Sequence, residues 1–443
     1  MRIHKPLSAD RMFSDIRNQM GEIKEHRPMN VVIPLQDALM SGLALFALKD
    51  PSLLAFEERR ATPQNLHQMF GIEQIPFDKL RTPPSDTQLR TILDGVDPQA
   101  LRPLYKRVFS QLEQGKVLEE MRFFQRYCLL SLDGTQYFSS PTVHCDSCLE
   151  RKNTRTSAIT YSHQMLGAAI VHPDHKTVIP LAPEPIIKQD GAEKNDCERN
   201  AAKRFFEKLR QDHPRLPLIV VEDALSSNAP HIEELKRHKL RFILGVKPGD
   251  HGYLFAQVAQ AKAEGRTSEF EFVRDGVTHR FCYLNDLPLN ESNAHVRVNF
   301  LEYWEIKGNK TSHFSWVTDL IIDRTNAYTL SRGGRARWKI ENETFNTLKN
   351  QGYHFEHNFG HGQQHLSVVF ALLMMLAFAI DQSQQMACQL FQDAWAKAGS
   401  KRFLWERMRS LFHELPFDSM TDIWRAIAFG FHIEGRIVIH DSS

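Results

Sequence analysis

The 443-residue chain has few cysteines, almost no net charge and no hydrophobic run long enough to cross a membrane. Six cysteines do not make a disulfide scaffold in a chain of this length, so a hydrophobic core must hold the fold. The longest apolar run, 368–380, has 13 residues, whereas a bilayer-spanning helix needs about 20. We therefore expect a buried helix there. The first residues contain no apolar stretch of the signal-peptide type, which predicts a cytoplasmic protein without a membrane partner.

The charge balance and the missing motifs exclude further classes. Lys and Arg total 55 against 53 for Asp and Glu, a net charge of +2, which argues against a protein that coats nucleic acid over its whole surface. The chain contains no GxxxxGK[ST], no GxGxxG after a strand and no GxSxG. Nucleotide-driven, dinucleotide-dependent and serine-hydrolase chemistries therefore have no support.

Hydrophobic periodicity divides the chain into regions. Residues 1–120 show helical spacing, with a capping-box signal that begins at Ser85, and predict a helical N-terminal domain. Strand and helix patterns then alternate, which is typical of a mixed α/β sheet flanked by helices. An Asp-Gly turn at 275–276 marks a hairpin inside an all-β insertion. The expected regions after the N-terminal domain are 121–251 (first part of the α/β core), 252–322 (β insertion), 323–390 (second part of the core) and 391–443 (helical, with a strand-like stretch at 435–440).

Three carboxylates stand where the patterns place strand ends and a helix. Asp133 precedes Gly134 at the end of an apolar strand, and the pair also fits a simple turn. Asp223 follows LPLIVV, a segment suited to a strand buried on both faces, and the ends of such strands are where α/β sites form. Glu341 lies on a predicted helix, one turn after arginines. Together they predict a site for two Mg²⁺ ions of the kind that supports phosphodiester displacement.

Basic residues cluster beside these acids in sequence. The segments 324–339 and 235–249 contain no acid, and 199–215 is predominantly basic. Such runs are usually solvated surfaces, but next to a carboxylate set they favour phosphate contacts. The predicted DNA-binding side chains are Arg335, Arg337, Trp338, Lys339 and Lys349.

The pattern His144-Cys145-x-x-Cys148 has the spacing of half a zinc site. Cys197 and His163 are candidates to complete it, and the alternatives are a loop thiol pair or a redox pair. A second group, His354, His357, His361 and His365, includes i, i+4, i+8 spacing that would align three imidazoles on one helix face. Because glycines interrupt the pattern and HExxH is absent, we favour packing or phosphate contact for these histidines over metal binding.

Three segments resemble the catalytic motifs of DDE transposases from bacterial insertion sequences. They are LDGTQYFSS (132–140), VVEDALSS (220–227) and RARWKIENETFNTLKNQGYHFEHNFGHG (335–362), and the overall pattern extends from about residue 30 to about 385. The resemblance implies an RNase H-like catalytic core with a β insertion before the helix that carries the glutamate. It also implies that Asp133, Asp223 and Glu341 bind two Mg²⁺ ions, for which Mn²⁺ can substitute.

The family's Tyr-Arg-Glu-Lys signature maps onto this chain with two departures. Arg337 stands four residues before Glu341 as the signature requires, but Gly334 occupies the tyrosine position and Lys349 falls one residue late. Glu343 is the alternative third ligand. We prefer Glu341 because Arg-Trp-x-Ile-Glu aligns without a gap.

The expected function is therefore a transposase that cleaves and joins DNA at the terminal inverted repeats of its element. Residues 1–120 would read the repeat, Arg337 and Lys349 would hold phosphates, and a homodimer would pair the two ends with target DNA. The rivals are a non-catalytic DNA-binding relative, a host nuclease with the same core, and a zinc-dependent hydrolase that uses the histidines and cysteines.

Overall fold

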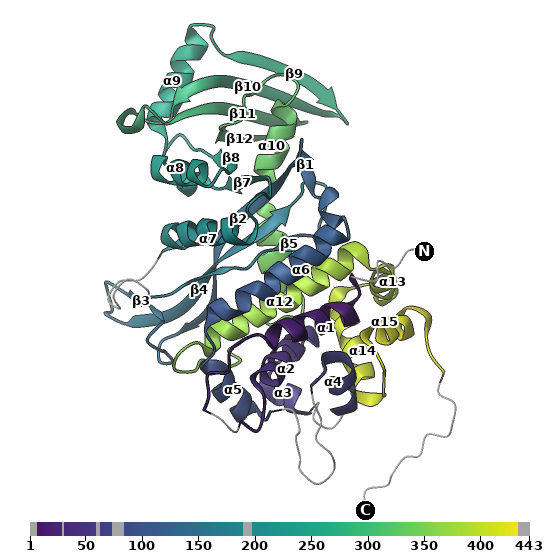
Figure 1. Cartoon of the computed structure of the whole chain (residues 1–443). Coiled ribbons are helices and arrows are strands. Elements are labelled where there is room, and N and C mark those ends of the chain that lie inside the picture. The colour runs from purple at the N-terminus through teal and green to yellow at the C-terminus, as the bar shows by residue number, and fades with distance from the viewer. Residues whose placement is uncertain (1–6, 29–30, 59–62, 73–83, 189–196, 433–443) are drawn as a thin grey trace, which may run out of the picture.

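A computed structural model describes residues 7–28, 31–58, 63–72, 84–188 and 197–432 of the chain. It has a mixed α/β fold with one 12-stranded sheet flanked by helices, as the sequence predicts at that level (Figure 1). The strand-like stretch at 435–440 lies outside the described residues.

The sheet runs in the order β3-β4-β2-β7-β8-β12-β11-β10-β9. Its central strands β2, β7 and β8 are parallel and the other pairings are antiparallel. As expected from its apolar sequence, β7 is buried along its whole length. The strands are β1 (Arg122–Phe124), β2 (Tyr127–Ser140), β3 (Leu149–Lys152), β4 (Ile159–Val171), β5 (Ile179–Pro180), β6 (Glu184–Ile186), β7 (Leu218–Glu222), β8 (Arg241–Gly245), β9 (Ser268–Arg274), β10 (Val277–Pro288), β11 (Arg297–Lys307) and β12 (Lys310–Thr318).

The segment 252–322 is not entirely β. It begins with helix α9 (Gly252–Ala263), so the expectation of an all-β segment is wrong there. Strands β9 to β12 follow as antiparallel hairpins, and the 275–276 turn has positive φ at both residues, as a tight hairpin requires. Because β12 pairs with β8, these strands continue the central sheet (Figure 1).

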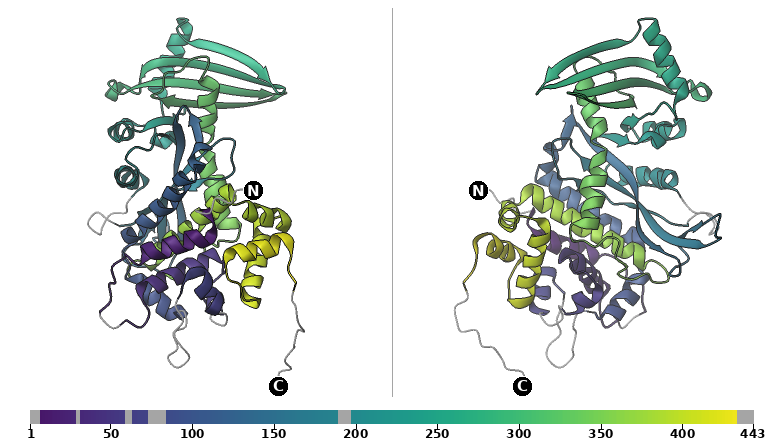
Figure 2. Two further views of the ribbon diagram at one scale, coloured as in Figure 1. Left: turned by 45° about the vertical axis from the view of Figure 1, so that its right-hand side comes forward. Right: turned by 180° about the vertical axis from the view of Figure 1, so that it is seen from behind.

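Helices from both ends of the chain pack around one central helix, α12 (Leu366–Ala387) (Figure 2). The N-terminal set contains the capping box predicted at Ser85, and Asp94 accepts four backbone N–H groups that lead into α12. The N-terminal helices are α1 (Ala9–Met20), α2 (Leu35–Ala47), α3 (Leu53–Glu57), α4 (Pro63–Phe70), α5 (Asp86–Asp94) and α6 (Arg102–Gln114); the C-terminal ones are α13 (Gln389–Ala398), α14 (Lys401–Glu414) and α15 (Met420–Phe429).

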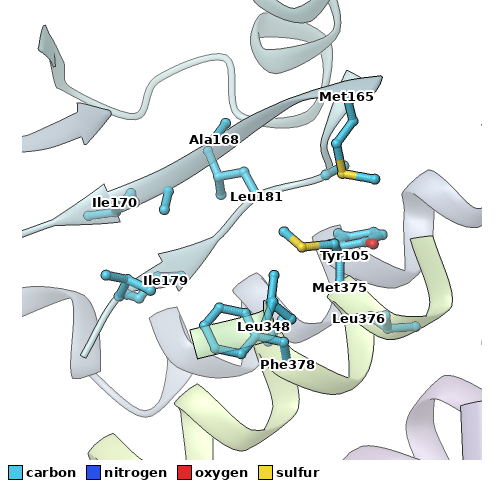
Figure 3. Close-up of a cluster of buried hydrophobic side chains, with 14 of the residues drawn as sticks. Tyr105, Met165, Ala168, Ile170, Ile179, Leu181, Leu348, Met375, Leu376 and Phe378 are labelled. Atoms are coloured by element: carbon cyan, nitrogen blue, oxygen red, sulfur yellow. The ribbon is translucent and has the colours of Figure 1, made fainter. Parts of the chain in front are cut away.

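Helix α12 carries the apolar run and is longer than that run. The helix has 22 residues, and its most apolar 18 have a mean hydropathy of 1.9, so by length and composition alone it could cross a membrane. Its most apolar 18-residue window is 100% buried inside the protein, as in the core helix of a soluble protein. Met375 and Phe378 of α12 lie with Ala168 and Ile170 of β4 in one apolar cluster (Figure 3).

Candidate functional site

Asp133 lies within strand β2. The strand runs through the Asp-Gly pair to Ser140, so the expectation that the strand ends there in a turn is wrong. Asp133 pairs with Gly167 of β4. Gly134 allows the close approach of helix α7 (Glu198–Asp212), because a Cβ there would lie 2.1 Å from Glu198 Oε1. The close approach brings a further carboxylate to Asp133.

Asp223 follows β7, as the sequence predicts, and its side chain accepts from the Leu225 N–H at 2.9 Å. Since β7 is the parallel neighbour of β2, Asp133 and Asp223 line one pocket of about 540 Å³. Glu198 and Arg337 also line it. The structure thus brings the two predicted aspartates to the same cavity.

Glu341 lies beside Asp133. It belongs to a π-helical segment, Ile340–Phe345, between α10 (Ala327–Arg335) and α11 (Asn346–Asn350). Arg337 Nη1 is 2.8 Å from Glu341 Oε1 and 3.7 Å from Asp133 Oδ2. Burial, followed by the hydrogen bond and negative charge of Glu341, raises the pKa of Asp133 to about 7, against the opposing effect of Arg337. The site thus concentrates negative charge that a cation would relieve.

Gly334, one of the two departures from the signature, packs closely against Trp316. A Cβ at Gly334 would lie 2.3 Å from Trp316 Nε1, so the indole occupies the space that a tyrosine side chain would need. The alternative ligand Glu343 interacts electrostatically with Lys401 at the start of α14. Only Glu341 of the two glutamates has a contact with Asp133 or Arg337 among the described interactions.

The predicted DNA-binding side chains contact different partners and do not all lie at one pocket. Arg335 pairs with Glu305 and Lys339 donates to the His175 carbonyl, while the half-exposed Trp338 lies under the Arg337 guanidinium at 4.3 Å. A second pocket of about 280 Å³ is lined by Asp223, Lys247, Arg335, Arg337 and Trp338. Lys349 pairs with Glu356 at 2.8 Å and lines neither pocket.

A buried cluster of Cys145, Cys148, His163 and His361 could hold a metal ion such as Zn²⁺. It is the one such group of nearby potential ligands among the described residues. Hydrogen bonds from Cys148 and the imidazoles lower the pKa of Cys145, whereas sharing that proton raises the pKa of Cys148. One thiol of the pair therefore favours the thiolate form, which binds metals.

The zinc set expected from sequence is wrong in two of its members. His144 stacks on Tyr161 at 4.3 Å, and Cys197 is exposed at the start of α7, where it lines the carboxylate pocket. His163, the candidate on β4, is in the cluster. His361 also belongs to the cluster. Residues 351–365 form no helix, so the expected alignment of three histidines on one helix face is absent there.

Further charged residues complete the carboxylate pocket. Glu198 has a pKa raised by burial and by the negative charges of Asp223 and Glu222. Glu222 in turn pairs with His231 at 2.6 Å. Glu222 is the last residue of β7 and lies within the second motif, whereas Glu198 and His231 lie outside the three motifs. The packing of α7 and α8 (Ala229–Arg237) on the sheet brings these two residues to the pocket.

No protein-family model matches the chain, and no curated protein sequence matches it. The resemblance to DDE transposases therefore depends on the three motifs.

Proposed function

We propose that the protein is a DDE-type DNA transposase, which acts in the bacterial cytoplasm at the terminal inverted repeats of an insertion sequence. The observation that carries the proposal is the meeting of the three motifs. Asp133 and Asp223 come from neighbouring parallel strands and face one pocket, and Glu341 lies beside Asp133. Along the chain, β hairpins precede the helical segment that carries Glu341. This order is the one expected for an RNase H-like core with a β insertion.

We expect the carboxylates of Asp133, Asp223 and Glu341 to bind Mg²⁺ or Mn²⁺, although they do not form a compact ligand group in the described structure. Both are hard cations that prefer carboxylates together with substrate phosphate oxygens. Burial and, after it, the neighbouring Glu341 carboxylate raise the pKa of Asp133, and a bound divalent cation would stabilise its charged form. When bound by Asp133, Asp223 and Glu341, such ions would activate the attacking oxygen and stabilise the leaving oxygen of a phosphodiester.

The protein's own cations would position the DNA. The second pocket adjoins the first at Asp223 and Arg337 and adds Lys247 and the exposed ring of Trp338. Basic side chains bind phosphates, and an exposed indole can stack on an unpaired base. Residues 1–120 would recognise the terminal repeat, and a homodimer would hold the two ends together with target DNA.

Cleavage of a terminal-repeat duplex tests the proposal. Purified protein is incubated with Mg²⁺ or Mn²⁺ and the inverted repeats that flank its coding sequence, and strand cleavage and joining are followed on gels. We expect metal-dependent cleavage that is abolished by Asp133→Asn and by Asp223→Asn. Cleavage that survives either substitution would contradict the proposed triad. Binding without cleavage would instead favour a non-catalytic relative, and cleavage without preference for the repeats would favour a host nuclease.

Glu341→Gln and Glu343→Gln form a matched pair two residues apart. Both remove one charge from the same π-helical segment, but only Glu341 contacts Asp133 and Arg337. Activity should be lost in Glu341→Gln and retained in Glu343→Gln. The reverse pattern would assign the third ligand to Glu343.

A further inference from the structure

Four donor atoms from distant parts of the chain meet in one buried cluster. Cys145 and Cys148 lie between β2 and β3, His163 is on β4, and His361 precedes α12. The ligand atoms all lie within 4.8 Å of one another. No local sequence feature requires this meeting, since His361 is 213 residues from Cys148.

Four of the six distances between the donor atoms are close to those of a tetrahedral zinc site. The two Sγ atoms are 3.9 Å apart, and three Sγ–Nε2 distances are 3.3 to 3.4 Å. Zn–S bonds of about 2.3 Å and Zn–N bonds of about 2.0–2.1 Å at tetrahedral angles put sulfur atoms about 3.8 Å apart and sulfur and nitrogen about 3.6 Å apart. The protein therefore already holds the four ligands close to the spacing that the ion needs.

Aromatic rings pack against both imidazoles, whose Nε2 atoms lie toward the thiols and whose buried Nδ1 atoms have no hydrogen-bond partner among the described residues. Tyr137 stacks on His163, and the Phe138 ring lies 4.4 Å from that of His361. All four ligand residues are buried, with exposed fractions of 0 to 8%. Four protein ligands complete a tetrahedral shell, which leaves no position for a catalytic water, so the cluster has the form of a structural site. This is unlike the open coordination that a zinc hydrolase requires.

We propose that Cys145, Cys148, His163 and His361 bind one structural Zn²⁺ ion that clamps the two halves of the carboxylate site together. His163 is four residues before Gly167, the β4 partner of Asp133. His361 lies in the segment that leads from the Glu341-bearing helix to α12. The ion would thereby tie the strands around Asp133 to the chain that follows Glu341. The role of the ion is to position these elements. This role does not depend on the reaction that the carboxylates support.

Metal analysis of the purified full-length protein tests the site directly. We expect about one Zn²⁺ per chain after purification without chelator. After removal of the zinc, Co²⁺ should produce the visible bands of a tetrahedral ion with a thiolate charge-transfer band. A wild-type protein that neither contains zinc nor takes up Zn²⁺ or Co²⁺ would overturn the proposal. So would a Cys145–Cys148 disulfide in protein kept under reducing conditions.

Matched substitutions identify the ligands. Cys148→Ser and His361→Ala should lose most of the zinc. The controls His144→Ala and Cys197→Ser alter the same residue types outside the buried cluster and should keep it. Equal zinc loss in His144→Ala and His361→Ala would contradict the assignment. Because a ligand variant can fail to fold, the Co²⁺ spectrum of the wild type provides an independent measurement of a sulfur–nitrogen site.

Hydrogen exchange tests the clamp separately from metal binding. On removal of zinc from the wild type, amides of 355–365 and of β4 should exchange faster, while those of α1 should change little. Unchanged exchange in 355–365 would show that the ion does not hold this segment. The transposase proposal is tested by cleavage alone, so the two can fail independently.

Discussion

Replacing Lys49 should destabilise the helical core by several kcal/mol. Its side chain is fully buried, and its ammonium lies 2.5 Å from Asp381 Oδ2 on α12. The ammonium also donates to the Ala47 carbonyl and lies over the rings of Tyr353 and Trp405 at 4.8 and 4.3 Å. This single cation thus joins the end of α2, helix α12, the segment after α11 and helix α14.

The contacts of Lys49 and Asp381 set the expected loss in the free energy of unfolding. Removing one partner of a buried ion pair costs about 3–5 kcal/mol because the other charge stays buried. The Tyr353 hydroxyl still donates to Asp381 at 2.6 Å, so we expect the lower end, about 3 kcal/mol, for Lys49→Met. At about 2.1 cal/mol/K per residue, 443 residues give an unfolding entropy near 0.9 kcal/mol/K, so this loss lowers the melting temperature by about 3 °C.

A double-mutant cycle distinguishes the ion pair from simple packing. Chemical denaturation of Lys49→Met, Asp381→Asn and the double variant should show that the double variant loses less stability than the sum of the single ones, by about 1–3 kcal/mol. Arg402→Met, which removes an exposed pair with Glu406, should change stability by less than about 0.5 kcal/mol. Strict additivity of the two core substitutions, or an unchanged midpoint for Lys49→Met, would refute the reasoning.

Two further predictions concern stability. Burial lowers the pKa of His213 to about 4, so as the pH falls below about 6.5 the unfolded chain binds the proton first and stability is lost until about pH 4. At pH 5 the loss should be about 1–2 kcal/mol, and a denaturation series for His213→Gln should lack this part of the pH dependence. In Gly167→Ala, the new Cβ would lie 2.7 Å from the Phe345 ring, next to Glu341, and overpacking should cost about 1–3 kcal/mol in thermal denaturation. Gly249→Ala, with nothing within 4 Å, is the control, and an equal effect at both glycines would contradict the steric argument.

The elements that could be predicted are those whose signals are local. The capping box at Ser85 and the hairpin at 275–276 depend on neighbouring residues, and both form as expected. The end of β2 could not be predicted in the same way. Asp133-Gly134 has the composition of a turn, but eleven residue pairs with β4 extend the strand through it, and the glycine serves the approach of Glu198 from α7. Strand pairing and helix packing of this kind join residues far apart in sequence.

In the candidate sites, too, some residues could be predicted from the sequence and others could not. Asp133 and Asp223 line one pocket because β2 and β7 are parallel neighbours, although Asp133 lies inside its strand and not at the end that the sequence predicts. The ligands that complete the cysteine pair could not both be predicted. His144 is adjacent to Cys145 in sequence but stacks on Tyr161, whereas His361 is 213 residues from Cys148 along the chain.

The basic segments show why charge in sequence differs from charge in space. The run 324–339 contains no acid, yet the fold pairs Arg332 with Asp174 and Arg335 with Glu305. Arg337 likewise balances Asp133 and Glu341. Under the proposed function, these three arginines would contact DNA only after giving up an internal partner. Because the salt dependence of DNA binding scales with the number of phosphates neutralised, it should be shallow for a protein of this size. The net charge of +2 therefore fits a protein that binds DNA at a local site.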